Sequence, residues 1–316
     1  MTSKAITVVI LTYFAVVSIT FLSAYFFPSD GTIPILLSMF LLIPIYIWHR
    51  NYTANKKQTQ EVNGRNKIAI LLWIFALFFL ALSVRIPFVL LFGAPYEKTS
   101  LIYLVILTIV VIEKTDISAI GFKTQNIGKA FLHGLAFYVL LGGITLIVLY
   151  SLIYAFTNQT PVLSYNIAPF VLAMPFQTLC VGVSEEGLFR GYMQTHLLKS
   201  YTLKKAILIQ AIFFGVWHFV WNLSPFNPWG MAQYVTVTFL VGIVFGYFYS
   251  KARNLAPLIF AHGLWNSVQG GILTNLAALD ALQRVPLLNQ ILVWLLPYAI
   301  SATLTVLFIK LFVKEI

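Results

Sequence analysis

Long apolar runs, separated by short polar segments, most constrain what this chain can fold into. Each run approaches the ~20 residues that an α-helix needs to cross a bilayer, and a backbone in lipid must satisfy its own hydrogen bonds. The chain is 60% hydrophobic with a mean hydropathy of +0.89, which excludes a soluble domain. We predict an all-α, polytopic helical membrane protein with about 8–10 transmembrane helices around an intramembrane polar cavity. The expected spans are residues 5–27, 33–48, 68–92, 100–112, 130–156, 167–198, 206–223, 232–250, 255–274 and 290–312.

Lysines and arginines are distributed unevenly between the two sets of loops that these spans define. The outer loops hold only Lys98 and Arg284, and Arg85 and Arg190 fall inside spans. Because cytoplasmic loops carry an excess of basic residues, both termini are predicted to be cytoplasmic, in a bacterial or archaeal cytoplasmic membrane. The net charge of +11 then reflects topology and contacts with membrane lipids, and no nucleic-acid partner is expected. The inner segments hold Lys4, Arg50, Lys56, Lys57, Arg65, Lys67, Lys114, Lys123, Lys129, Lys199, Lys204, Lys205, Lys251, Arg253, Lys310 and Lys314.

A polar linker over residues 113–129 divides the chain into two regions. Residues 1–129 form an N-terminal transmembrane region with basic cytoplasmic connectors, of which 49–67 is the longest. Residues 130–316 hold the remaining spans and the polar residues considered below. We expect a single membrane domain without a soluble module.

Three ionisable side chains lie close together in the apolar segment 167–198: Glu185, Glu186 and Arg190. A charge near the bilayer centre costs roughly 2.5–3.5 kcal/mol on insertion scales, so such a cluster indicates a functional site. Glu186 and Arg190 are four residues apart, the spacing at which an acid and a base pair on one helix face. Glu185 is then expected to lack a salt-bridge partner, which makes it a candidate proton acceptor.

Two histidines and an asparagine are predicted to lie in later spans at a similar depth. His218 follows Phe214 by four residues, and Asn266 follows His262 by four, so each pair shares a helix face. At a rise of 1.5 Å per residue, His218, His262 and Glu185 lie about 18, 10 and 20 Å from the inner ends of their spans. A lone histidine in a span is more often a helix-to-helix hydrogen-bond donor. Their combination with an unpaired glutamate favours catalysis.

Three motifs follow one another along the chain: Glu185-Glu186-x-x-x-Arg190, Phe214-x-x-x-His218 and His262-x-x-x-Asn266. Together they resemble the three signatures of the CAAX protease and bacteriocin-processing (CPBP or Abi) family of intramembrane endopeptidases. In these signatures the chain is similar to type II CAAX prenyl endopeptidases. The motifs lie within residues 165–275, in the region 130–316. The resemblance implies that Glu185 is the general base, that His218 is its partner on the water, and that His262 and Asn266 stabilise the oxyanion. Glu186 and Arg190, with Phe214, would support the site.

A metal is the main alternative to direct activation of water by the glutamate. Glu185, His218 and His262 could form a zinc site with an open position for water, and the family is often labelled metalloprotease. The sequence lacks His-Glu-x-x-His, and the three residues come from separate helices, so their spacing does not establish coordination. We favour metal-free activation. If zinc binds, His262 changes from oxyanion donor to ligand.

The resemblance predicts an endopeptidase that cleaves a membrane-associated peptide, either prenylated or of the leader type, or a membrane protein. We expect the scissile bond to be reached from the cytoplasmic side. One alternative is a non-catalytic scaffold that regulates another membrane protein. Another is an ion-coupled transporter, which the lack of an evident inverted repeat disfavours. The single cysteine, Cys180, is more typical of a packing residue than of a nucleophile, and we expect His49, His133 and His196 to pack near the membrane surfaces.

Overall fold

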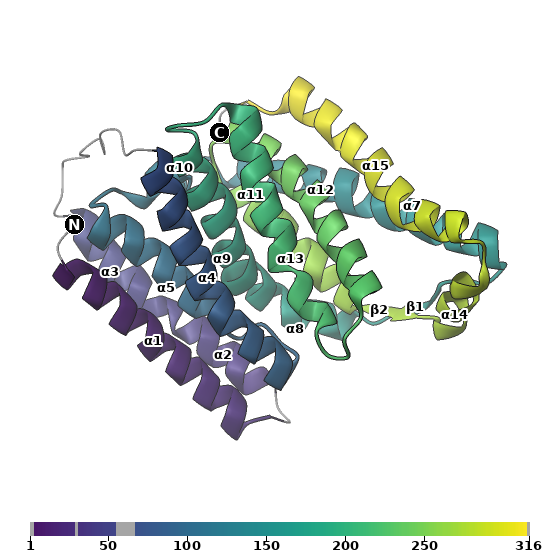
Figure 1. Cartoon of the computed structure of the whole chain (residues 1–316), viewed down its shortest axis with the longest axis horizontal. Helices are drawn as coiled ribbons and strands as arrows, with labels where there is room; N and C mark the ends of the chain where they lie inside the picture. The colour runs from purple at the N-terminus through teal and green to yellow at the C-terminus, as the bar shows by residue number, and fades with distance from the viewer. Residues whose placement is uncertain (1–2, 29–30, 55–66, 315–316) are drawn as a thin grey trace.

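The N-terminal helices lie side by side against one flank of the helices that carry the polar motifs (Figure 1). The computed structural model describes residues 3–28, 31–54 and 67–314. The N-terminal group comprises α1 (Ser3–Phe26), α2 (Thr32–Phe40), α3 (Leu42–Ala54), α4 (Lys67–Phe92) and α5 (Lys98–Leu107). The remaining helices are α6 (Ile127–Tyr138), α7 (Ile144–Thr157), α8 (Ile167–Phe176), α9 (Val183–Glu186), α10 (Thr195–Leu197), α11 (Leu203–Trp217), α12 (Pro228–Ala252), α13 (Ala256–Gly270), α14 (Leu276–Arg284) and α15 (Leu287–Phe312).

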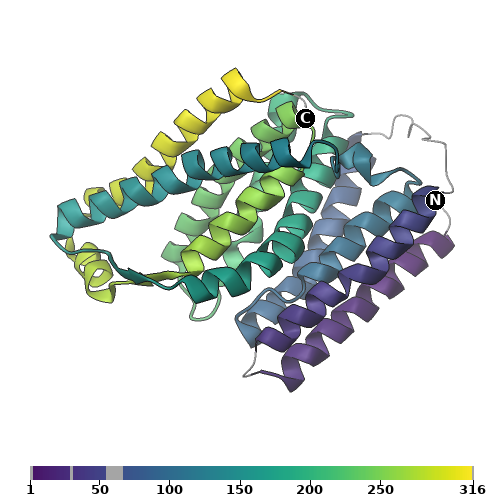
Figure 2. The ribbon, with the colours of Figure 1, turned by 180° about the vertical axis from the view of Figure 1, so that it is seen from behind.

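The apolar runs form helices of membrane-spanning length. Seven helices in the described part of the chain are long and apolar enough to cross a membrane, and the ranges 32–48 and 98–112 are shorter apolar helices. The chain is therefore a polytopic helical membrane protein, as predicted. Most of the basic connector expected at 49–67 lies outside the described residues. Seen from behind, α7 and α15 run together at the end of the bundle away from the N-terminal helices (Figure 2).

Helix α5 is short because it lies inside the protein rather than across its surface. All ten of its residues, Lys98–Leu107, are buried, and it packs between α1 and the helix that carries Glu185. A helix that is apolar on every side is typical of such a position. It is the first indication that Lys98 does not lie in an outer loop.

The segment Ile167–Leu197 runs as one continuous helical stretch with two widened turns. The π-helical segments Gln177–Gly182 and Gly187–Gln194 flank α9, which holds the two glutamates. Such π-turns are rare and occur frequently at functional sites, because the extra residue per turn redirects the side chains that follow. Every residue from Ser184 to Gln194 is buried.

Two glycines bring α13 close to this stretch. A Cβ atom on Gly263 would collide with Thr178 Oγ1, and one on Gly182 would lie 2.7 Å from the carbonyl oxygen of Ile259. Both approaches are closer than real contacts allow, so only glycine permits them. The close packing sets the distance between His262 and Glu185.

A short β-ribbon and the helix α14 lie in the connections between predicted spans, and the ribbon's second strand takes the last residues of the span predicted at 255–274. Strand β1 (Val162–Tyr165) pairs antiparallel with β2 (Ile272–Thr274), and Asn275 Oδ1 caps α14 by accepting from the Ala277 N–H. The predicted span 255–274 is therefore wrong at its end, because α13 stops at Gly270. Consecutive glycines favour that stop, and the carbonyl of Gly271 instead accepts from the Asn166 N–H at 2.8 Å.

One apolar core joins the N-terminal helices to the motif helices. It includes buried residues of α1, α4 and α5 together with Phe189, Tyr192 and Trp217. The division of the chain at residue 129 stays a prediction, and this core extends across it.

Candidate active site

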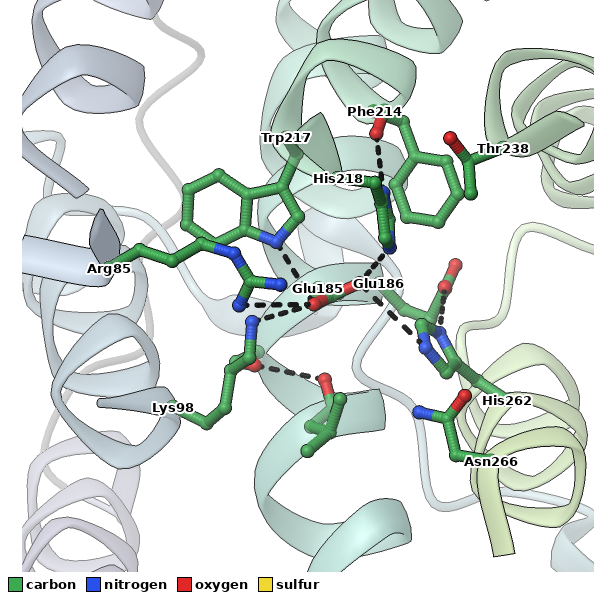
Figure 3. Close-up of polar contacts among 12 residues, drawn as sticks. Arg85, Lys98, Glu185, Glu186, Phe214, Trp217, His218, Thr238, His262 and Asn266 are labelled. Atoms are coloured by element: carbon green, nitrogen blue, oxygen red, sulfur yellow. Dashed lines mark hydrogen bonds and ion pairs between the residues drawn. The ribbon is translucent and has the colours of Figure 1, made fainter. Parts of the chain in front are cut away.

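The side chains singled out in the sequence converge from three helical segments (Figure 3). Glu185 lies on α9, His218 directly follows α11, and His262 and Asn266 lie on α13. Glu185 Oε2 is 3.8 Å from His218 Nε2 and 3.7 Å from His262 Nε2. Within the described structure this buried oxygen has no hydrogen-bond partner. Polar atoms at such separations are commonly bridged by one water molecule.

The other carboxylate oxygen of Glu185 is fully engaged. Glu185 Oε1 accepts a hydrogen bond from Lys98 Nζ at 2.6 Å and another from Trp217 Nε1 at 3.0 Å. The expectation that Glu185 lacks a salt-bridge partner is therefore wrong, and so is the placement of Lys98 in an outer loop. Both errors have one cause: α5 is buried, so its first residue faces the interior. The carboxylate is held by one oxygen and presents the other to the imidazoles.

Lys98 belongs to a buried network of alternating charges on the α4–α5 side of Glu185. Arg85 Nη1 donates to Glu97 Oε1 at 2.8 Å, and Glu97 Oε1 lies 3.4 Å from Lys98 Nζ. Arg85 and Lys98 also lie over the Trp217 ring, at 4.6 and 4.7 Å from its centroid. Two cations and two carboxylates balance, which is how buried charges are tolerated. The sequence held one signal for this network: Arg85 lies inside the predicted span 68–92, and an arginine within a span requires a partner.

The hydrogen bonds of the two histidines identify which ring nitrogens are free. His218 Nδ1 donates to the Phe214 carbonyl at 2.7 Å, and His262 Nδ1 donates to Glu186 Oε1 at 2.8 Å. The partner of one ring nitrogen decides the role of the other. In both residues Nε2 is therefore the nitrogen that faces Glu185. Phe214 supports the site through its backbone carbonyl and through its ring, which packs edge-on against His218 at 4.7 Å.

Glu186 links the second histidine to an arginine. Glu186 Oε1 accepts from Arg190 Nη1 at 3.2 Å as well as from His262 Nδ1. The predicted pairing of Glu186 with Arg190 is confirmed. The guanidinium of Arg190 also lies over the rings of Phe214 and Phe245, at 4.1 and 4.8 Å. This arrangement fixes the orientation of the His262 ring from the side away from Glu185.

Asn266 lies one helical turn beyond His262 and faces the same cavity. Its Nδ2 donates to Gln177 Oε1 at 2.9 Å, which orients the carboxamide and leaves its second N–H available. A cavity of about 210 Å³ is lined by Lys98, Glu185, His218, His262 and Asn266 among others. The four predicted residues thus share one polar cavity.

Two other predicted positions do not line this cavity. His196 is buried, and its Nε2 lies 2.8 Å from Glu113 Oε2 in the polar linker. Glu113 also accepts from the Tyr192 hydroxyl at 3.0 Å, so the polar linker is anchored to the motif helix. Cys180 is buried and its sulfur accepts from Thr99 Oγ1 at 3.6 Å, consistent with a packing residue.

Comparison with known protein families assigns the segment that carries these motifs. Residues 167–268 match the family described as "Type II CAAX prenyl endopeptidase Rce1-like". This segment is similar to that family, and we refer to it as the Rce1-like domain. The predicted resemblance to the CAAX protease family is confirmed, and it supports an intramembrane protease of the CAAX type. The Rce1-like domain contains Glu185, His218, His262 and Asn266, whereas Lys98 lies outside it. No curated protein and no solved structure matches the chain.

The residues present do not form a metal-binding group as they are arranged. Among the described residues, no set of three His, Cys, Asp or Glu side chains has the geometry to hold a metal ion. Glu185 Oε1 is occupied by a lysine and an indole N–H, so only its other oxygen faces the histidines.

Proposed function

We propose that the chain is an intramembrane endopeptidase in which Glu185 and His218 activate a water molecule for attack on a peptide bond. One observation carries this proposal: Glu185 Oε2, buried and without a partner in the described structure, faces the Nε2 atoms of two histidines at 3.7 and 3.8 Å. A water between Glu185 and His218 would donate one proton to the carboxylate as its oxygen attacks the carbonyl carbon. Glu185 would then return that proton to the departing amine nitrogen.

His262 and Asn266 are proposed to stabilise the oxyanion. Because His262 Nδ1 donates to Glu186, a second proton on Nε2 would make the ring an imidazolium that donates toward the cavity. The free N–H of Asn266 Nδ2 would supply another donor, since its partner N–H is engaged by Gln177. Charge developing on the substrate carbonyl oxygen would then meet two fixed donors. Arg190, through Glu186, acts as a positioning residue for His262.

The site lies in a cavity between helices, which suits hydrolysis within a membrane. A peptide segment must enter a cavity rather than a surface groove, so the substrate is proposed to be a membrane-associated peptide, prenylated or leader-like, or a membrane protein. We propose a cytoplasmic membrane of a bacterium or archaeon as the location, with both termini in the cytoplasm, because the described basic residues gather at one end of the helices.

Peptidomics of membranes provides the test. Cells that produce Glu185→Gln or His218→Ala are compared with cells that produce the unaltered chain, and a cleavage product that depends on both residues is expected to disappear. Glu113→Gln is the matched control, because it alters a buried glutamate that contacts His196 and Tyr192 rather than the site. Unchanged peptide profiles and a retained cellular phenotype in Glu185→Gln, at normal protein level, would refute hydrolysis and support the scaffold alternative.

A further inference from the structure

The side of Glu185 that faces away from the histidines holds a cluster of buried charges (Figure 3). Arg85 lies on α4, Glu97 is the N-cap residue of α5, and Lys98 is the first residue of α5. These three side chains and Glu185 are each no more than 2% exposed. The three partners lie outside residues 167–268, the Rce1-like domain. The front half of the chain therefore supplies the charges that surround the proposed base on this side.

Distances assign one cation to each acid in this cluster. Lys98 Nζ is 2.6 Å from Glu185 Oε1 and 3.4 Å from Glu97 Oε1. Arg85 Nη1 is 2.8 Å from Glu97 Oε1 and 4.0 Å from Glu185 Oε1. Lys98 is thus the cation closest to Glu185, and Arg85 is held mainly by Glu97. Without Lys98 the cluster would contain two acids and one cation, and Glu185 would be the acid without an adjacent cation.

The other described groups around Glu185 do not replace Lys98 as the direct cationic partner of this carboxylate. Trp217 Nε1 donates to Glu185 Oε1, but the indole is neutral. Arg190 is engaged by the neighbouring Glu186. The two histidines face the other oxygen from 3.7 and 3.8 Å, separations longer than a direct hydrogen bond. Lys98 is therefore the group that balances the charge of Glu185.

We propose that Lys98 is a positioning residue that keeps Glu185 ionised and leaves its second oxygen free to contact water. The inference rests on the proposed function, in which Glu185 is the general base. A buried carboxylate that loses its cation takes up a proton rather than stay charged, and a protonated carboxyl cannot accept a proton from water. Helices α4 and α5 thus contribute to catalysis, because they set the charge of a residue that lies in the Rce1-like domain.

A compensating pair of substitutions tests the charge balance. Lys98→Met leaves two acids and one cation, so we expect Glu185 to be protonated. Adding Glu97→Gln removes the acid that engages Arg85; one cation and one acid then remain, and Glu185 should be ionised again. Thr99→Val is the matched control, because Thr99 is equally buried in the same turn of α5 and its hydroxyl donates to a backbone carbonyl at 2.8 Å.

Infrared spectroscopy reports the state of Glu185 without a substrate. Each purified variant in detergent micelles is compared with the same variant carrying Glu185→Gln, which assigns the C=O stretch of a protonated carboxyl to this residue. We expect that band in Lys98→Met, and we expect none in the unaltered chain, in Thr99→Val or in Lys98→Met/Glu97→Gln. The band in the unaltered chain, or its absence from folded Lys98→Met, overturns the inference. If Lys98→Met does not accumulate, the double variant decides, because a protonated Glu185 there contradicts the charge balance.

Hydrolysis provides a second measurement, on a synthetic peptide that spans a bond identified by the membrane peptidomics described above. We expect Lys98→Met to lower kcat by about 10²-fold with little change in KM, as for loss of a general base. Adding Glu97→Gln should raise kcat again by at least about tenfold, a recovery that a loss of packing alone would not show. An unchanged kcat in folded Lys98→Met, or no recovery in the double variant, contradicts the role of Lys98. The expected infrared bands without any cleavage by the unaltered chain would instead refute the proposed function.

Discussion

Replacing Lys98 by methionine tests whether the lysine stabilises the carboxylate of Glu185. Lys98→Met keeps much of the side-chain volume and removes the charge. At the observed 2.6 Å and an effective dielectric of about 20, the gross Coulomb attraction is about 6 kcal/mol. Desolvation offsets part of it, and removing one partner of a buried pair typically costs about 3–5 kcal/mol. Because Trp217 still donates to Glu185 and Arg85 lies 4.0 Å away, we expect a loss near the lower limit, about 3 kcal/mol.

A double-mutant cycle separates the pair from general disruption of the core. Unfolding free energies in detergent micelles are measured for the unaltered chain, Lys98→Met, Glu185→Gln and the double variant. Each single variant leaves the other group without its partner, whereas the double variant removes both charges. We expect the double variant to be more stable than the sum of the single losses predicts, by about 1–2 kcal/mol.

The matched control for this cycle is Lys205→Met, which alters an exposed lysine on α11. It should change the unfolding free energy by no more than about 0.5 kcal/mol. The reasoning fails if Lys98→Met behaves like Lys205→Met. It also fails if the losses from the two single variants add to within about 0.5 kcal/mol in the double variant.

Three further predictions concern the same site. Gly263→Leu should prevent either the accumulation of folded protein or the cleavage of substrate, because a Cβ at this position would collide with Thr178. Gly143→Ala should be tolerated, since a Cβ there meets nothing within 4 Å. Equal behaviour of the two variants in a folding assay would contradict this prediction. Asn266→Ala should lower kcat by about 10²–10³ with little change in KM, since loss of an oxyanion donor affects the transition state; a change confined to KM would assign Asn266 to binding instead. Treatment with a chelator followed by exhaustive dialysis should leave the rate of hydrolysis unchanged, and restoration of a lost rate by zinc alone would establish a metal mechanism.

Contacts between residues close in sequence were predictable from spacing, and contacts across the fold were predictable only where a motif marked the residues. Glu186 and Arg190 pair because they are one helical turn apart, a relation that spacing alone reveals. Lys98 and Glu185 are 87 residues apart, and a lysine at the start of an apolar run is typical of a loop. Its burial depends on α5 being enclosed by other helices, which hydropathy does not show because lipid and protein interior are both apolar.

His196 illustrates the same limit at the other end of the motif helix. A histidine near the end of a span suggests an interfacial position, but spacing does not reveal its contact with Glu113, 83 residues earlier in the chain. The ribbon of β1 and β2 was missed because two strands of three or four residues carry too few alternating positions to be distinguished from the ends of neighbouring apolar helices. The four predicted site residues share one cavity, although Glu185 lies between two π-helical segments rather than in a long regular helix.

Because α5 is buried against the motif helix, the Rce1-like domain depends on a helix that lies outside its own sequence. A chimera that grafts residues 167–268 onto the front helices of another membrane protein would inherit both histidines and both glutamates, but not the ammonium group that contacts Glu185. Its new front helices would have to supply a cation at that position, because otherwise Glu185 would keep the hydrogen bond from Trp217 but lose its ion pair. Engineers who wish to retarget this domain should therefore carry α4 and α5 with it.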